Sequence, residues 1–461
     1  MLCVFTIAAG LTVSRLLPRR LALWQPPEIA TSRLAWPAGV LGAAARAPAS
    51  ATSAGVARAI APVVTGTSFG PRLGVMVTDL ASGHVLYASK ASTGFAPAST
   101  TKVATSIAAL HVLGPNARFT TSVVAAAGIR EIVLVGGGDP TLSADPLPVA
   151  AYPQPASLYA LARHTAAALR ARGRHSVRLG YDASLYTGPG LGPGWPASYV
   201  STGNVSPITP LEVDQGRVTA AGAPADNQAS GGLRAADPTA VAVTTFARFL
   251  TGDGIVVHGA PVPAHAPAGA SPLASVQSPP LTQIVQWMLE ESNNVIAENL
   301  ARHVAIATGR QPSFGGAAAA ETAVLRGFGV TGVLTLHDGS GLSPENRIAP
   351  ATLIELVRLA ASRPVLRPVL SGLPVEGFSG TLGRGGSVFG LGAAPGFGVV
   401  RAKTGNLGTV AALAGTVYAR NGQLIAFAIM ADQIPALPGA LGRAATAMVN
   451  VASALAGCGC R

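Results

Sequence analysis

Lysine is scarce in this sequence. Only Lys90, Lys102 and Lys403 occur, among 32 lysine and arginine residues in a chain of 461. Arginine stays protonated in proteins and cannot act as a base, whereas a buried lysine can lose its proton. In a chain that uses arginine almost everywhere else, a retained lysine indicates a position where the chemistry of the amine is needed.

Cysteine is absent from the body of the chain. The three cysteines are Cys3, Cys458 and Cys460, a distribution that excludes an internal disulfide framework and zinc-finger spacing. The eight histidines show no His-Glu-x-x-His arrangement, and no Gly-x-x-x-x-Gly-Lys phosphate loop occurs. We therefore expect no metal site and no cofactor, and we assign no role to the two cysteines of the tail.

Aromatic and charged residues are also few, at 5% and 11% of the chain, and no internal apolar run is long enough to span a membrane. The length and the 49% of hydrophobic residues indicate a globular protein of about two or three domains. The net charge of +12 favours anionic partners such as an acidic cell wall. Because no basic block is interleaved with aromatic residues, we expect no nucleic acid as a partner.

The N-terminal segment differs in composition from the rest of the chain. Residues 2–13 form a short apolar run that is typical of a signal-peptide core or a truncated membrane anchor, and the chain to about residue 55 is rich in Ala, Pro and Ser. We expect residues 1–57 to be a leader or anchor followed by a flexible tether, in a protein exported across the cytoplasmic membrane. An ordinary disordered N-terminus is the alternative.

A Ser-x-x-Lys step, Ser99 to Lys102, stands at the head of a predicted helix. Pro97 favours a helix start, an apolar run continues to Leu110, and Gly114-Pro115 ends the helix. Residues three apart share one helix face, so the hydroxyl and the amine can meet. A serine hydroxyl becomes a nucleophile when a base takes its proton, and a desolvated lysine can be that base. Taken alone, this motif also arises by chance in surface helices.

Two further steps follow in order. Ser292-Asn293-Asn294 lies between two predicted helices, 281–291 and 295–308, where it could also be a simple helix cap. Lys403-Thr404-Gly405 lies on a predicted strand, 399–405.

We expect one antiparallel sheet to combine strands from both ends of the chain, with the final helix across it. Its strands are predicted at residues 72–79, 84–89, 399–405, 409–418 and 424–430, and the helix at 441–455. The region between the first two motifs is predicted to contain further strands and helices, an irregular segment and a linker. These are strands 118–124, 131–135, 176–180 and 255–257, helices 158–172 and 239–250, the irregular segment 186–210 and the linker 261–272.

The three motifs in this order are similar to those of penicillin-binding proteins and serine β-lactamases. Four longer stretches resemble the D-alanyl-D-alanine carboxypeptidase/endopeptidase family, the class C low-molecular-mass penicillin-binding proteins. These stretches are Val135–Leu142, Glu291–Glu298, Asp338–Ser343 and Ser379–Leu382. The resemblance implies an α+β penicillin-binding-protein/β-lactamase-like transpeptidase fold. We expect the catalytic domain at 58–117 and 276–461, and a large insertion at 118–275.

The resemblance also implies roles for the motif residues. Ser99 would attack the carbonyl of a D-Ala-D-Ala bond and become the acyl-enzyme, and Lys102 would take its proton. Ser292 would relay a proton to the leaving amine, and Asn294 would bind the substrate amide.

The third motif would bind the substrate carboxylate. Lys403 would supply positive charge near that carboxylate and hold Ser292, Thr404 would bond the carboxylate, and Gly405 would belong to the same substrate-binding strand. The backbone N–H groups of Ser99 and Asn406 would form an oxyanion hole. At Asn406 the sequence departs from the family, which usually has a hydroxyl residue there, so the side-chain contact with the carboxylate is open.

The expected function is that of a serine-type D-Ala-D-Ala carboxypeptidase acting on peptidoglycan stem peptides and inhibited by β-lactam antibiotics. The balance between carboxypeptidase and endopeptidase activity stays open. A β-lactamase or esterase on the same scaffold is one alternative, and a non-catalytic cell-wall binding protein is another. Because no motif falls inside 118–275, we expect that this region can be cut back, somewhere between about residues 145 and 267, without losing acylation by a small β-lactam.

Overall fold

The computed structural model describes residues 50–125, 129–222, 232–267, 270, 272–383 and 388–460. The apolar run 2–13 and most of the expected tether lie outside these residues. Within the described ranges, none of the helices combines the length and apolarity needed to cross a membrane. The expected tether nevertheless extends too far, because helix α2 (Ser53–Val64) begins inside it and buries Val56 and Ile60.

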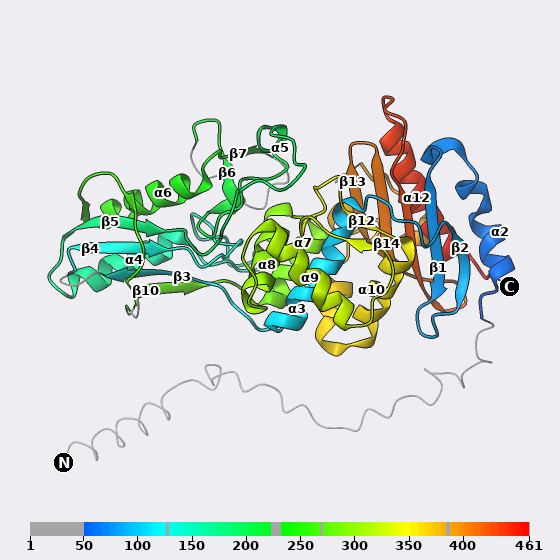
Figure 1. Cartoon of the computed structure of the whole chain (residues 1–461), viewed down its shortest axis with the longest axis horizontal. Helices are drawn as coiled ribbons and strands as arrows, with labels where there is room; N and C mark the ends of the chain where they lie inside the picture. Colours follow the sequence, from blue (N-terminus) through cyan, green and yellow to red (C-terminus); the bar gives the residue numbers. More distant parts are fainter. Residues whose placement is uncertain are drawn as a thin grey trace, which may run out of the picture. The chain divides into compact units, whose positions relative to one another are not determined.

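A five-stranded antiparallel sheet combines the two ends of the chain, as predicted (Figure 1). Its order is β13 (Val400–Leu407), β14 (Val410–Tyr418), β15 (Leu424–Ala431), β1 (Leu73–Asp79) and β2 (Val85–Ser89). Alternate residues of β15 enter two different cores: Phe427 and Ile429 pack with α12 (Ala440–Gly457), whereas Ala428 and Met430 pack toward α10 (Pro350–Ser362). This alternation follows from the two-residue period of a strand with both faces covered.

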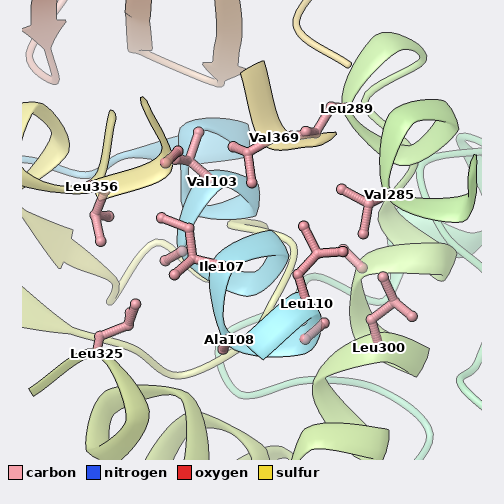
Figure 2. Packing of buried hydrophobic residues seen from close by; sticks show 14 of the residues in the cluster. Val103, Ile107, Ala108, Leu110, Val285, Leu289, Leu300, Leu325, Leu356 and Val369 are labelled. Carbon is pink, nitrogen blue, oxygen red and sulfur yellow. The ribbon is translucent and has the colours of Figure 1, made fainter. Parts of the chain in front are cut away.

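Helix α3 (Thr101–Leu113) is the centre of the helical layer. Ten of its 13 residues are buried, because it is apolar on all sides and other helices surround it. Figure 2 shows Ile107 and Leu110 of α3 among side chains such as Leu300 and Leu325 from neighbouring helices. The layer consists of α3, α7 (Leu281–Glu290), α8 (Asn294–Ala307), α9 (Phe314–Gly327), α10 and α11 (Arg367–Ser371). Shorter elements nearby are η3 (Ala98–Thr100), η5 (Pro364–Leu366), β11 (Leu334–Thr335) and β12 (Arg347–Ile348).

A second sheet lies between the first two motifs in the sequence. Its order is β10 (Pro272–Gln277), β3 (Thr120–Ala125), β4 (Glu131–Val135), β5 (Ser176–Asp182) and β8 (Val256–Val257), with β9 (Val262–Pro263) also paired to β5. Together with α4 (Leu158–Arg170) and α6 (Pro238–Gly252) it forms what we call the outer lobe. The linker expected at 261–272 instead contains β9 and the start of β10, because backbone pairing with β5 and β3 orders this Pro- and Ala-rich chain.

The chain enters and leaves the outer lobe side by side. Ser278 N donates to Phe119 O at 2.9 Å, and Leu281 N donates to Ala117 O at 2.8 Å. Residues 183–217, which we call the arm, are largely irregular, as predicted for 186–210. The arm contains α5 (Ser198–Ser201) and η4 (Asp214–Gly216), and it ends in β6 (Arg217–Val218), which pairs with β7 (Leu233–Arg234).

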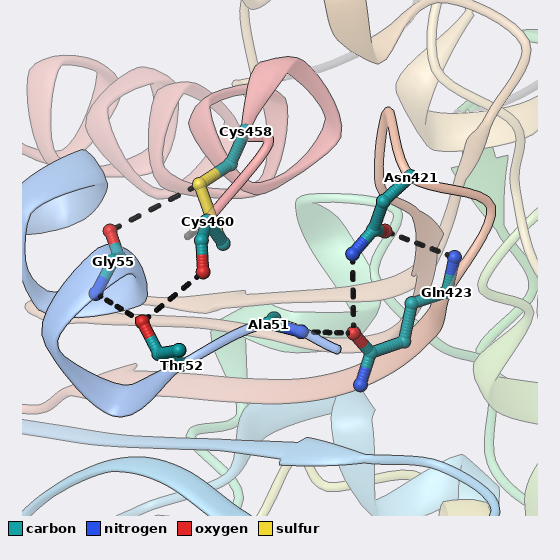
Figure 3. The surroundings of a disulfide bond; sticks show 7 residues. All are labelled: Ala51, Thr52, Gly55, Asn421, Gln423, Cys458 and Cys460. Atoms are coloured by element: carbon teal, nitrogen blue, oxygen red, sulfur yellow. Dashed lines mark hydrogen bonds between the residues drawn. A yellow bond between two sulfur atoms is a disulfide. The ribbon is translucent and has the colours of Figure 1, made fainter. Parts of the chain in front are cut away.

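The C-terminal tail is joined to the start of α2 (Figure 3). Cys458 and Cys460 form a disulfide, and Cys460 O accepts hydrogen bonds from Thr52 N at 2.7 Å and from Thr52 Oγ1 at 3.2 Å. A side chain at Gly55 would collide with Cys460, since an added Cβ would lie 2.4 Å from its carbonyl oxygen. The remaining short helices are η2 (Thr67–Phe69), η6 (Gly380–Leu382) and η7 (Ala394–Gly396).

Candidate active site

Ser99 and Lys102 lie side by side at the start of α3. Lys102 Nζ donates to Ser99 Oγ at 2.9 Å. Its other two hydrogen bonds go to Asn294 Oδ1 at 2.7 Å and to Ser340 O at 2.8 Å. An ammonium group has three N–H donors, so these three acceptors fix the Lys102 head group in one place.

Burial lowers the pKa of Lys102 to about 7, while the negative charges of Asp338 and Glu298 act in the opposite direction. Because the side chain is fully buried, the charged form loses the hydration that it would have in water. A large fraction of the amine is therefore unprotonated near neutral pH. Lys102 can accept a proton from the adjacent Ser99 hydroxyl, which is the first requirement for an activated serine.

The second motif forms a tight turn between α7 and α8. Ser292 has a positive φ of 57°, which is uncommon for a residue with a Cβ and turns the chain sharply. Asn293 caps α8 by accepting from Ile296 N at 3.0 Å. Asn294 begins α8 and bonds to Lys102 through Oδ1, while its Nδ2 donates to Asn204 O at 2.9 Å. The capping interpretation is thus correct for Asn293, whereas Asn294 belongs to the site.

The third motif lies on β13, at one edge of the five-stranded sheet. Lys403 is fully buried, and Nζ donates to Thr404 O at 3.0 Å. Burial lowers the pKa of Lys403 well below its usual range; the charge of Lys102 lowers it further and that of Glu291 raises it. The hydroxyl of Thr404 lies 2.6 Å from that of Thr381 in η6, within the Ser379–Leu382 stretch noted in the sequence.

Gly405 permits β13 to pass close to the nucleophile. A Cβ at this position would lie 2.7 Å from Pro97 O and 3.2 Å from Ser99 N, so any side chain would push the strand away from the Ser99 turn. Asn406 follows on the same strand and is exposed. The third motif therefore adjoins the turn that presents Ser99.

One contact implied by the resemblance is not formed. Across the described ranges, no hydrogen bond joins Lys403 Nζ to Ser292, whose side chain is half-buried. The two lysines are instead related through their charges, since Lys102 lowers the pKa of Lys403. Among the same residues, no group of three or more His, Cys, Asp or Glu side chains could bind a metal ion.

Several contacts at the site were not predicted from the sequence. The arm contacts these residues directly: Asn204 O accepts from Asn294, Gln215 Oε1 accepts from Asn293, and Trp195 Nε1 donates to Asp338 Oδ2 at 2.8 Å. The stretch 145–267, which we expect can be cut back without loss of acylation, therefore includes residues that contact Asn294 and Asp338. The Asp338–Ser343 stretch was noted as a resemblance, but nothing in the sequence indicated that the Ser340 carbonyl would bind Lys102.

Comparisons with known proteins agree with this geometry. The sequence matches the D-Ala-D-Ala carboxypeptidase 3 (S13) family over residues 57–232 and 221–455. It is 36% identical over 413 residues to carboxypeptidase DacB of Mycolicibacterium smegmatis, covering 89% of this chain and 85% of that protein. Carboxypeptidase Rv3627c of Mycobacterium tuberculosis is also 36% identical, over 435 residues that cover 92% of this chain and 88% of the relative.

The fold is also that of a solved structure. Penicillin-binding protein 4 (dacB) from Haemophilus influenzae superimposes with a TM-score of 0.70 at 23% identity, covering 85% of this chain and 98% of the other. This similarity confirms the predicted penicillin-binding-protein-like fold. The chain belongs to the D-Ala-D-Ala carboxypeptidase 3 (S13) family and is a serine-type D-Ala-D-Ala carboxypeptidase.

Proposed function

We propose that this carboxypeptidase works through an acyl-enzyme on Ser99, with Lys102 as the base. Unprotonated Lys102 Nζ takes the proton of Ser99 Oγ, which attacks the carbonyl carbon of the D-Ala-D-Ala bond. The C–N bond then breaks, the leaving D-alanine amine takes up a proton, and water hydrolyses the Ser99 ester. The observation that supports this proposal is the 2.9 Å hydrogen bond between Lys102 and Ser99, made by a buried lysine whose pKa is about 7.

The other motif residues would bind the substrate and the developing charge. We propose that Ser292 relays the proton and that Asn294 binds the substrate amide. One N–H of Asn294 Nδ2 is donated to Asn204 O, and the other can be donated to the substrate. Lys403 and Thr404 would attract and bind the terminal carboxylate. Gly405 would keep β13 close to the nucleophile, and the N–H groups of Ser99 and Asn406 would form the oxyanion hole.

The proposed substrates are peptidoglycan stem peptides that end in D-Ala-D-Ala, with β-lactam antibiotics as inhibitors. The Haemophilus influenzae protein has been solved in complex with a β-lactam, and the present chain shares its fold. Such substrates place the enzyme outside the cytoplasmic membrane, and a net charge of +12 suits an anionic wall. We propose export directed by the N-terminal segment, either secreted or anchored there; fractionation of cells that express the full chain tests this.

Labelling with a fluorescent penicillin, followed by mass mapping of the modified residue, tests the chemistry. We expect one adduct, on Ser99, and none in Ser99→Ala. An adduct on another residue, or labelling that persists in Ser99→Ala, would show that the nucleophile is wrongly assigned.

Replacing the base tests the second half of the proposal. Lys102→Arg keeps the positive charge, but arginine stays protonated, so we expect acylation to be abolished in a folded protein. In the wild-type enzyme, acylation should rise with pH through about 7, because Lys102 must lose its proton before it can accept one from Ser99. A Lys102→Arg variant that acylates at the wild-type rate would contradict this role.

A further inference from the structure

Glu298 lies on α8, one turn after Asn294, and its side chain is buried. Oε1 accepts hydrogen bonds from Gly339 N at 3.1 Å and from Ser340 N at 2.7 Å. The carboxylate therefore binds two successive backbone N–H groups of the loop 338–341. Burial and the charge of Asp338 raise the pKa of Glu298 to about 7, and its ionised form accepts stronger hydrogen bonds than a neutral group does.

The same loop segment contacts the base. Ser340 donates its N–H to Glu298, and its carbonyl accepts from Lys102 Nζ at 2.8 Å. Ser340 thus binds Glu298 through its N–H and the head group of Lys102 through its carbonyl. Ser340 is fully buried, so bulk water does not compete for either contact.

Further contacts position this loop against the nucleophile. Thr105 Oγ1, on α3, donates to Gly339 O at 2.7 Å, and Asp338 Oδ1 accepts from Gly341 N at 2.8 Å. A Cβ at Gly341 would lie 1.9 Å from Ala98 O, so the loop backbone packs directly on the turn that presents Ser99. A displacement of the loop would therefore move a ligand of Lys102 and a neighbour of Ser99 together.

We propose that Glu298 is a positioning residue for acyl transfer: by binding the loop 338–341 it directs the Ser340 carbonyl at Lys102 and fixes the base beside Ser99. The proposal rests on the proposed function of Lys102 as that base. Glu298 has no contact with the nucleophile and acts through the loop.

Charge provides a second effect that can be measured separately. Glu298 and Asp338 both raise the pKa of Lys102 against the effect of burial, and Lys403 is the neighbouring cation on β13. Glu298 in turn faces Asp338 and Arg302, and Glu321 of α9 lies close to it. Because burial raises the pKa of Glu298 to about 7, its carboxyl group is partly ionised where Lys102 titrates. Removing that partial negative charge should let Lys102 lose its proton at lower pH, so the rise of acylation rate with pH should move downward.

The test measures the acylation rate constant with a fluorescent penicillin across the pH range in which Lys102 titrates. Glu298→Gln keeps the shape and one acceptor oxygen but removes the charge, so the rise should move down by about one pH unit. Glu298→Asp keeps the charge but withdraws the carboxylate from the loop, so the rate should fall about ten- to hundredfold, with a smaller shift of the profile.

Two more variants separate positioning from general damage. Thr105→Val removes another anchor of the same loop without changing a charge, and it should slow acylation while the pH profile stays in place. Glu321→Gln is the matched control for charge. It is the same substitution at a buried carboxyl of the same cluster, but burial raises the pKa of Glu321 well above its usual range, so no negative charge is removed and the pH profile should stay in place.

Wild-type rates and an unmoved profile in both Glu298 variants, with thermal unfolding like that of the wild type, would overturn the proposal. If the Glu298 variants do not fold, Thr105→Val decides, since a wild-type rate there would show that the loop does not control the base. Failure of the wild-type enzyme to acylate at Ser99 would instead refute the proposed function.

Discussion

The outer lobe and the arm come from the same stretch of chain between the first two motifs, but they are built differently. The outer lobe has a hydrophobic core of its own, formed by residues such as Leu134, Leu161 and Phe246. The arm shares its apolar cluster with the helical layer, because Trp195 and Val205 pack with Val295, Phe314 and Leu342. Its polar groups likewise bind residues of the active site.

The difference shows that an inserted segment without motif residues can still contact the motif residues directly. Arm side chains or carbonyls bind Asp338, Asn293 and Asn294. No such contact joins the described residues of the outer-lobe sheet to the three motifs. We propose that the outer lobe can be altered without affecting acylation, whereas the arm cannot.

Trp195→Ala should have the largest effect. The variant opens a cavity beside Phe314, whose ring centroid lies 5.1 Å away, and removes one of the hydrogen-bond donors to Asp338 Oδ2. We expect a loss of about 4 kcal/mol in the free energy of unfolding and a fall in acylation rate. Urea denaturation and penicillin labelling measure the two. Trp195→Phe, which has an aromatic ring but no N–H, should recover most of the stability. A normal acylation rate in Trp195→Ala would show that acylation does not depend on this contact of the arm.

Leu161→Ala should destabilise the outer lobe without affecting the chemistry. Leu161 is fully buried in α4, and its truncation should cost about 3 kcal/mol. Its matched control is Leu300→Ala on α8, an equally buried leucine in the core around α3 (Figure 2). Acylation measured well below the unfolding temperature should be normal in Leu161→Ala and slower in Leu300→Ala. An equal fall in acylation rate in the two variants would show that damage to the outer lobe also impairs the chemistry, and that the outer lobe is not separable from acylation.

Gln215→Met, a substitution in the arm, should loosen the turn formed by Ser292, Asn293 and Asn294 and slow acylation. Gln215 is fully buried, and its Oε1 accepts hydrogen bonds from Asn293 Nδ2 and from an Arg217 guanidinium N–H. Methionine removes that acceptor, so we expect acylation to slow about tenfold, equivalent to about 1.4 kcal/mol. Gln215→Glu keeps the acceptor and should restore the rate. If Met and Glu behave alike at this position, the arm does not position the Ser292 turn.

Asn406→Thr, outside both regions, should have the smallest effect. The exposed side chain can donate to a carboxylate, while the proposed oxyanion role uses only the backbone N–H. We expect normal acylation by penicillin and a change of about threefold or less in affinity for substrates with a free C-terminal carboxylate. Kinetics on a D-Ala-D-Ala peptide and its C-terminal amide separate the two roles. An equal change on both substrates would exclude a side-chain role in binding the carboxylate.

The local sequence pattern alone predicted most of the helices and strands. Strands β1, β4, β14 and β15 and helices α4, α7 and α8 lie within about two residues of their predicted bounds, because alternating or helical apolar periodicity and Gly, Pro or Asn boundaries are local signals. Helices α2 and α9 were missed. The first lies in a segment whose composition is typical of a tether, and α9 is an Ala- and Gly-rich segment stabilised by packing against α8 and α3.

The sequence by itself also determined where the three motifs stand, since a Ser-x-x-Lys step, a Ser-Asn-Asn step and a small-residue strand are short local patterns. Only the tertiary structure decided what surrounds Lys102. Lys102 binds Asn294 and Ser340, which lie 192 and 238 positions away in the chain, and Asn204 binds Asn294 across 90 positions. A backbone carbonyl is present at every residue, so its position on a folded loop has no counterpart in local sequence. For the same reason, the contacts of Glu298 and Trp195 with residues 338–340 form only when the helices, the loop 338–341 and the arm are packed together.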